Sequence, residues 1–293
     1  MKEMTYPGMI LIDGGEFSKG SARFYEEERP VKRVRVNSFW IDETPVTNKV
    51  FARFVDETGY VTLAERIAEG MSVARMPAAG SSVFARPEHP VDLGDPSQWW
   101  EFRASACWRH PLGQHSTTAG LEEHPVVHVA YEDATAFASW AGKELPAEAE
   151  WEFAARGGLD GEDYAWGNSL APDGLMLGNY WQGEFPMQNT LADGWERTSP
   201  VRSYPGNGYG LFDMIGNVWE WTSDLWTVSN AAQGGKPSCC STKRPEQESS
   251  LVLKGGSHLC AQNYCQRYRP AARHAQPARE TTGHIGFRCI VRV

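Results

Sequence analysis

The sequence has 293 residues, enough for one large domain or two small ones. Its 37 acidic and 28 basic residues give a net charge of −9, which argues against a nucleic-acid-binding surface of clustered cations. No apolar run approaches the roughly 18 residues that a membrane-spanning helix needs. We therefore expect neither a nucleic acid nor a membrane as partner.

The first predicted elements are two strands, over residues 9–12 and 31–39, which show an apolar run and an apolar alternation. A helix follows, with Thr47 as its N-cap and Gly59 as its end. Apolar side chains between these two residues recur at helical spacing, so one face of this helix is expected to be buried.

A second helix is predicted over residues 133–140. A third has Pro146 in its first turn and ends at residues 157–158, both of them glycine. Residues 66–106 mix Ala, Gly, Ser and Pro and favour a mobile insertion. No repeat or linker divides the chain, so we expect one domain over residues 1–293.

Two cysteines stand five positions apart, at Cys260 and Cys265. On a helix that spacing separates the side chains by roughly 140°, and on a strand it puts them on opposite faces. A turn over residues 261–263 would bring the sulfurs together, and the glycines at 255–256 allow close backbone approach. Spacing alone leaves open a disulfide or two unrelated buried thiols.

Three arginines follow the pair, at Arg267, Arg269 and Arg273, and nearby positive charge favours a reactive thiolate. Six cysteines in the whole chain are too few for a disulfide scaffold. The adjacent Cys239 and Cys240 are either a strained vicinal disulfide or two free thiols, and no function is assigned to them or to Cys107.

Longer motifs surround the cysteine pair. Residues 254–273 read KGGSHLCAQNYCQRYRPAAR, and GFRC stands at 286–289. Upstream lie WEFAARGG at 151–158, NYWQGEFP at 179–186 and NGYGLFDMIGNVWEWTSD at 207–224. In this order the motifs resemble those of the formylglycine-generating enzymes, or sulfatase-modifying factors. The resemblance implies an α+β, C-type-lectin-like fold with little regular secondary structure and long loops rich in Gly and Trp.

The resemblance also implies a reaction. Two thiolates suit a soft metal such as Cu(I), and the family assigns that ion to Cys260 and Cys265. The expected substrate is an unfolded sulfatase segment carrying Cys-x-Pro-x-Arg, whose cysteine is oxidised by O2 to Cα-formylglycine. Ser257 and Trp219 match the family's oxygen pocket beside the metal. Tyr264 either lines the same pocket or belongs to the core.

Two structural calcium ions are implied as well, bound through side-chain and main-chain oxygens. The first site corresponds to Asn179, Tyr180, Asp193 and Trp195. The second corresponds to Glu28, Asp213, Gly216, Val218 and Glu220. Without the resemblance, these acids read as ordinary loop carboxylates.

Several features favour the cytoplasm. The sequence starts without a secretion signal. Secretory members of the family carry two disulfides, and this chain has Ala138 and Ala155 at one position of each. We expect a cytoplasmic monomer. The alternative functions are a non-catalytic peptide-binding protein on the same fold and a related iron-dependent protein like the sulfoxide synthases. The cysteine pair opposes the first, and the lack of a preceding helical domain opposes the second.

Overall fold

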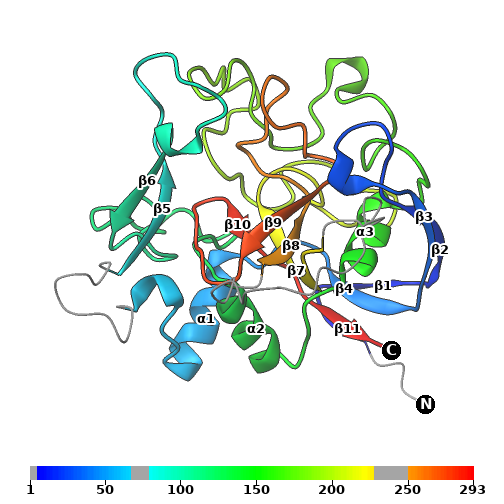
Figure 1. The fold of residues 1–293 in the computed structure, drawn as a ribbon. Coiled ribbons are helices and arrows are strands. Elements are labelled where there is room, and N and C mark those ends of the chain that lie inside the picture. Colours follow the sequence, from blue (N-terminus) through cyan, green and yellow to red (C-terminus); the bar gives the residue numbers. More distant parts are fainter. Residues whose placement is uncertain (1–4, 67–78, 228–249) are drawn as a thin grey trace, which may run out of the picture.

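The computed structural model describes residues 5–66, 79–227 and 250–293 (Figure 1). Within these residues it has three α-helices and four small sheets joined by long loops, which confirms the predicted α+β character with little regular structure. None of the described helices is long and apolar enough to cross a membrane. Short 3-10 helices lie in the loops: η1 Glu26–Glu28, η2 Leu63–Glu65, η3 Pro96–Gln98 and η4 Pro172–Gly174.

The central sheet has the strand order β10-β7-β8-β9. Its members are β7 Trp219–Leu225, β8 Ser250–Lys254, β9 Arg273–Pro277 and β10 Ile285–Gly286. Neighbouring strands are antiparallel, except that β10 runs parallel to β7. The register of β8 and β9 pairs Lys254 with Arg273, so both ends of the cysteine-bearing segment leave the sheet side by side.

A second sheet joins strands from both ends of the chain. Strand β4 (Phe39–Asp42) lies between β1 (Met9–Ile12) and β11 (Ile290–Arg292), antiparallel to each. In Figure 1 the strands β1 and β11, from opposite ends of the described chain, lie near one another with β4.

The single strand predicted over residues 31–39 is wrong at its end. Strand β3 (Lys32–Val36) stops early and pairs with β2 (Gly15–Lys19), while Phe39 begins β4. The break includes Ser38, whose hydroxyl accepts a hydrogen bond from the backbone N–H of Gly14 at 3.0 Å.

The first predicted helix is confirmed as α1 (Asn48–Thr58). The Thr47 hydroxyl accepts a hydrogen bond from the N–H of Val50 at 3.4 Å, and Gly59 ends the helix with a φ of 68°.

The other two helices exist with shifted starts. Helix α2 (Tyr131–Trp140) begins two residues early because the Asp133 carboxylate accepts the N-cap backbone N–H at 2.8 Å. Helix α3 (Glu148–Arg156) begins two residues after Pro146 and ends at Gly157, which has a φ of 58°.

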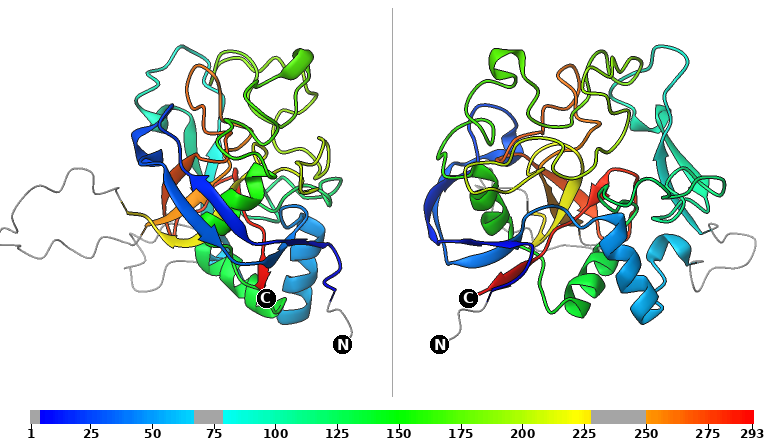
Figure 2. Two further views of the ribbon diagram at one scale, coloured as in Figure 1. Left: turned by 90° about the vertical axis from the view of Figure 1, so that its right-hand side faces the viewer. Right: turned by 180° about the vertical axis from the view of Figure 1, so that it is seen from behind.

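The mobile insertion predicted over residues 66–106 is wrong for its described part. Strands β5 (Gly80–Phe84) and β6 (Trp100–Ala104) pair antiparallel there, while residues 67–78 lie outside the described range. This pair packs through an aromatic cluster onto the loop after α3 and the cysteine-bearing loop. The cluster consists of Phe84, Trp99, Trp181, Phe185, Leu259 and Ala261. Figures 1 and 2 show the long loops at the end opposite α1 and α2.

Candidate active site

The loop between β8 and β9 folds back on itself where it leaves the sheet. Gly255 and Gly256 both have positive φ, at 94° and 73°. A Cβ atom on Gly256 would lie 2.7 Å from the carbonyl oxygen of Arg267. Only glycine lets the outgoing and returning arms of the loop pass at this distance.

Two turns in this loop bring the cysteine sulfurs together. The N–H of Cys260 donates to the carbonyl of Ser257, and that of Cys265 donates to the carbonyl of Ala261, both at 2.9 Å. The two Sγ atoms lie 3.4 Å apart. The turn predicted over residues 261–263 is confirmed, and both thiols are free.

The two thiols have different environments. Burial raises the pKa of Cys260 well above its usual value. The pKa of Cys265 is lowered to about 6, because the hydrogen bond from the Cys260 thiol and the positive charge of Arg267 together outweigh the effect of burial. The Arg267 Nη1 atom lies 3.7 Å from the Cys265 sulfur. Near neutral pH the pair therefore holds one thiol and one thiolate.

The other two arginines serve different partners. Arg269 forms a buried pair with Glu28, with Nη1 2.9 Å from Oε2. Arg273 Nη2 lies 3.1 Å from a carboxylate oxygen of Glu148. Of the three arginines predicted to act on the thiols, only Arg267 touches one.

A cavity of about 350 Å³ opens beside the cysteine pair. Trp219, Ser257 and Tyr264 all line it together with both cysteines, so the structure brings all five residues predicted for catalysis to one place.

Each of the three plays a structural part too. The Ser257 hydroxyl accepts the N–H of Leu259 at 3.2 Å. The Tyr264 ring stacks on Phe185 with centroids 4.7 Å apart, so this tyrosine belongs to an aromatic core and lines the cavity. Trp219 is buried at the start of β7.

Sequence reasoning missed several cavity residues. The additional wall residues include Trp99, Trp100, His274, Gln276 and His284. The His274 ring lies 5.7 Å from that of Trp219. These residues carry no motif. His274 and Gln276 lie on β9, His284 directly precedes β10, and Trp99 and Trp100 come from the start of β6 in the separate β5–β6 sheet.

The cysteine pair fits a soft monovalent metal. The pair supplies two sulfurs in van der Waals contact, one of them a thiolate beside a guanidinium. Soft thiolate ligands select Cu(I) over hard cations. Cys260 and Cys265 would hold such an ion. Cys239 and Cys240 lie outside the described residues.

The first predicted calcium set is hydrogen-bonded within the protein. The Asp193 carboxylate accepts the Tyr204 hydroxyl at 2.8 Å and the N–H of Trp195 at 3.0 Å. The main-chain oxygen of Asn179 accepts a backbone N–H at 2.8 Å, and that of Tyr180 accepts a side-chain amide at 3.0 Å. Asp193 is the only residue of this set that has a carboxylate. Calcium at this site stays a prediction.

The side chains of the second predicted calcium set do not fit the ion. The Glu220 carboxylate accepts hydrogen bonds from Trp151 and Arg288, each at 2.8 Å. Arg288 also donates to the main-chain carbonyl of Asp213 at 3.2 Å, while the Asp213 carboxylate accepts the backbone N–H of Arg202 at 2.9 Å. A buried cation already neutralises Glu220.

The fold does not place Glu28 with the other residues of this second predicted set, because the Glu28 carboxylate is paired with Arg269. In the described ranges, no three or more His, Cys, Asp or Glu side chains are grouped to hold a metal. Gly216 and Val218 lie in the loop just before β7, the strand that carries Glu220, and offer only main-chain oxygens.

Comparison with known proteins extends these observations. The whole chain, residues 1–293, matches the family described as the sulfatase-modifying factor enzyme 1-like domain. The formylglycine-generating enzyme of Mycobacterium tuberculosis is 48% identical, covering 96% of this chain and 97% of its own length. That of Streptomyces coelicolor is 46% identical, over 96% and 88%. The inactive Cα-formylglycine-generating enzyme 2 of Mus musculus is 38% identical, over 97% and 85%.

Among solved structures, PvdO from Pseudomonas aeruginosa has the same fold. It superposes with a TM-score of 0.64 at 22% identity, covering 97% of this chain and 94% of its own.

Proposed function

Since the chain belongs to the formylglycine-generating enzyme family, we propose that it converts a sulfatase cysteine to Cα-formylglycine. The substrate is an unfolded segment carrying Cys-x-Pro-x-Arg, the oxidant is O2, and Cys260 and Cys265 bind Cu(I). The observation that carries the proposal is the 3.4 Å contact of the two sulfurs in the wall of the cavity.

The residues around this cavity divide the work. When bound, Cu(I) supplies a site for the substrate sulfur and for electron transfer to O2. Arg267 holds positive charge at the Cys265 sulfur. Trp99, Phe185 and Tyr264 form an aromatic wall of the cavity beside the two sulfurs. Oxidation removes one hydrogen from the substrate Cβ and one from its thiol, and O2 takes up these two hydrogens with their two electrons, at the level of hydrogen peroxide. Hydrolysis of the resulting thioaldehyde consumes one water, releases hydrogen sulfide and leaves the aldehyde.

We further propose that the protein acts as a monomer in the cytoplasm. The four cysteines in the described part of the chain are free thiols, as a reducing compartment requires.

The direct test is mass spectrometry of a Cys-x-Pro-x-Arg peptide incubated with copper-loaded protein in air. We expect an aldehyde product that an aminooxy reagent traps. Cys260→Ser and Cys265→Ser should each abolish it, because each removes one sulfur of the pair. Cys107→Ser and Cys289→Ser are matched controls, since both thiols are buried away from the cavity, and both variants should retain activity.

Absence of aldehyde with the copper-loaded native protein would contradict the function and favour a non-catalytic peptide-binding protein. Equal loss of activity in all four variants would show that the cysteines are structural.

A further inference from the structure

A segment from the start of the chain packs against the loop that carries the cysteines. Residues 24–28 include η1 and lie about 240 positions away in sequence. The Tyr25 hydroxyl accepts the backbone N–H of Gln266 at 3.0 Å. The Glu27 carboxylate accepts hydrogen bonds from Arg267, with Nε at 3.2 Å. The segment is thus hydrogen-bonded to the two residues that directly follow Cys265.

Arg267 connects this segment to the sulfur. Its Nε and Nη2 atoms bind Glu27, while Nη1 lies 3.7 Å from the Cys265 Sγ. The guanidinium carbon also lies 3.9 Å from the centroid of the Tyr25 ring. A guanidinium is planar and rigid, so holding two of its nitrogens fixes the direction of the third. Glu27 and Tyr25 together therefore decide where Nη1 points.

We propose that Glu27 is a positioning residue of the cysteine site, which orients Arg267 so that its Nη1 faces the Cys265 sulfur. The inference rests on the proposed function, because it treats the sulfur pair as the Cu(I) site. A guanidinium fixed beside the sulfur stabilises the negative charge that two thiolates keep around a monovalent cation. Glu27 then strengthens Cu(I) binding without touching the metal or its ligands.

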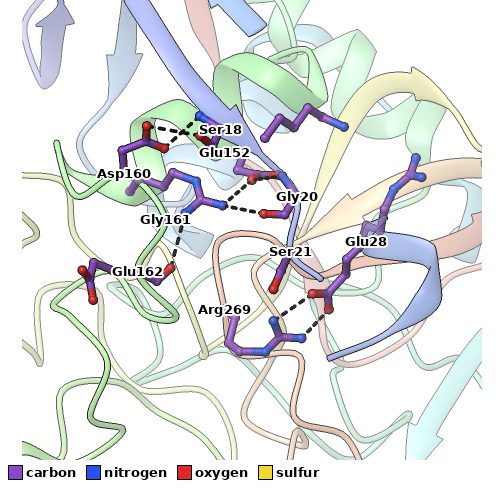
Figure 3. Close-up of polar contacts among 12 residues, drawn as sticks. Ser18, Gly20, Ser21, Glu28, Glu152, Asp160, Gly161, Glu162 and Arg269 are labelled. Carbon is purple, nitrogen blue, oxygen red and sulfur yellow. Dashed lines mark hydrogen bonds and ion pairs between the residues drawn. The ribbon is translucent and has the colours of Figure 1, made fainter. Parts of the chain in front are cut away.

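The neighbouring residue Glu28 provides a control within the same 3-10 helix. It also binds an arginine of the cysteine-bearing loop, Arg269, and Figure 3 shows the two parallel contacts of this buried pair. The Arg269 guanidinium lies 3.7 Å from the centroid of the Phe24 ring. The Arg269 guanidinium donates its hydrogen bonds to Glu28 and to the carbonyl of Gln266, and not to either sulfur. Glu27 and Glu28 therefore share a structural role, and only Glu27 reaches the sulfur through its arginine.

The test measures the dissociation constant for Cu(I) by competition with a chromophoric Cu(I) chelator, in parallel with the melting temperature. Glu27→Ala should weaken Cu(I) binding about tenfold, the size of one lost charge-assisted hydrogen bond. Glu27→Gln keeps an oxygen acceptor for Arg267 and should recover part of the loss. Glu28→Ala should lower the melting temperature and leave the Cu(I) dissociation constant unchanged.

A double variant shows whether Glu27 acts through Arg267. Arg267→Met should weaken Cu(I) binding by itself, and adding Glu27→Ala should weaken it no further. Additive losses would overturn the inference, because Glu27 would then act by another route. Equal weakening in Glu27→Ala and Glu28→Ala would overturn it as well, since both would report a structural role alone.

The proposed function is checked separately with the native protein. If the native protein makes aldehyde, the proposed function stands. If Glu27→Ala and Glu27→Gln then bind Cu(I) as tightly as the native protein, the inference about Glu27 is overturned and the function is unaffected. Native protein that neither binds Cu(I) nor makes aldehyde contradicts the function itself.

Discussion

The hydroxyl of Ser257 uses its oxygen as an acceptor for the Leu259 N–H and has no described acceptor for its own hydrogen. The backbone N–H of Ser257 points at the Cys260 sulfur, 3.4 Å away. Because the side chain also lines the cavity, its free hydrogen is available to a group bound there. Two roles follow for this residue: it shapes the turn before Cys260, and it offers one donor to the reacting groups.

Ser257→Ala separates these two roles. Loss of a donor to developing negative charge should lower kcat about a hundredfold, equivalent to roughly 2.7 kcal/mol. The peptide Kd and Cu(I) binding should stay near native values, because neither sulfur is changed. The measurement is kcat, peptide Kd and melting temperature on one protein. A native kcat with a lowered melting temperature would leave only the structural role.

Helices and strands differ in how much of the information that specifies them lies within their own residues. Thr47 and Gly59 mark the ends of α1 from within the element, so sequence alone predicts it. Strand β9 has no apolar alternation of its own and forms because β8 pairs with it in register. A strand is stabilised by its neighbours in the sheet, and these neighbours are remote in sequence. The residue pattern within each segment therefore does not predict the central sheet.

Helix α3 carries a buried carboxylate, Glu152, that contacts two other parts of the fold and one arginine of its own helix. The Glu152 carboxylate binds Lys254 at 2.9 Å, Arg156 at 2.7 Å and the N–H of Gly20 at 2.7 Å. Figure 3 shows Glu152 beside Gly20 in this cluster. Burial raises the pKa of Glu152, but the charges of Lys254 and Arg156 outweigh that effect and lower the pKa to about 2.

This pKa gives the fold an acid-sensitive contact. A carboxylate with a lowered folded pKa stabilises the protein above its unfolded pKa, roughly 4.3, and loses that contribution as the pH falls. Glu152→Gln should therefore lower the free energy of unfolding at pH 7 by about 3 kcal/mol. It should also flatten the loss of stability between pH 4.5 and 2 (roughly the span between the two pKa values).

Urea unfolding over this pH range checks the expectation, with Glu57→Gln as the control because the Arg53–Glu57 pair is solvent-exposed. Parallel pH profiles for native protein and Glu152→Gln would show that Glu152 does not titrate in this window.

At the scale of the whole molecule, the site combines segments that are remote in sequence. The cysteine pair was predictable because its five-residue spacing and flanking glycines lie within one loop. The contributions of Glu27, Trp99 and His274 were not, because each depends on tertiary packing that brings a different strand or turn to that loop.

Calcium binding would affect the stability of the whole molecule, and this effect can be measured. A ligand that binds only the folded state stabilises it by mass action, so we expect EGTA to lower the melting temperature. Asp193→Ala, which removes the carboxylate of the first predicted set, should abolish this response. Glu220→Ala should lower the melting temperature whether or not EGTA is present, because it leaves Arg288 without its buried partner. A melting curve that EGTA does not change would contradict calcium binding.

The sheet that joins both ends of the chain sets an order of events during synthesis. Strand β4 has partners on both sides, β1 made before it and β11 made last of the described strands. A growing chain on the ribosome therefore exposes one open edge of β4 until the final strand emerges, and open edges invite pairing with other chains. The cysteine-bearing loop leaves the ribosome before that edge is closed. This sheet is thus expected to be complete only after β11 has been made, and slow translation of the segment that leads to β11 should increase aggregation.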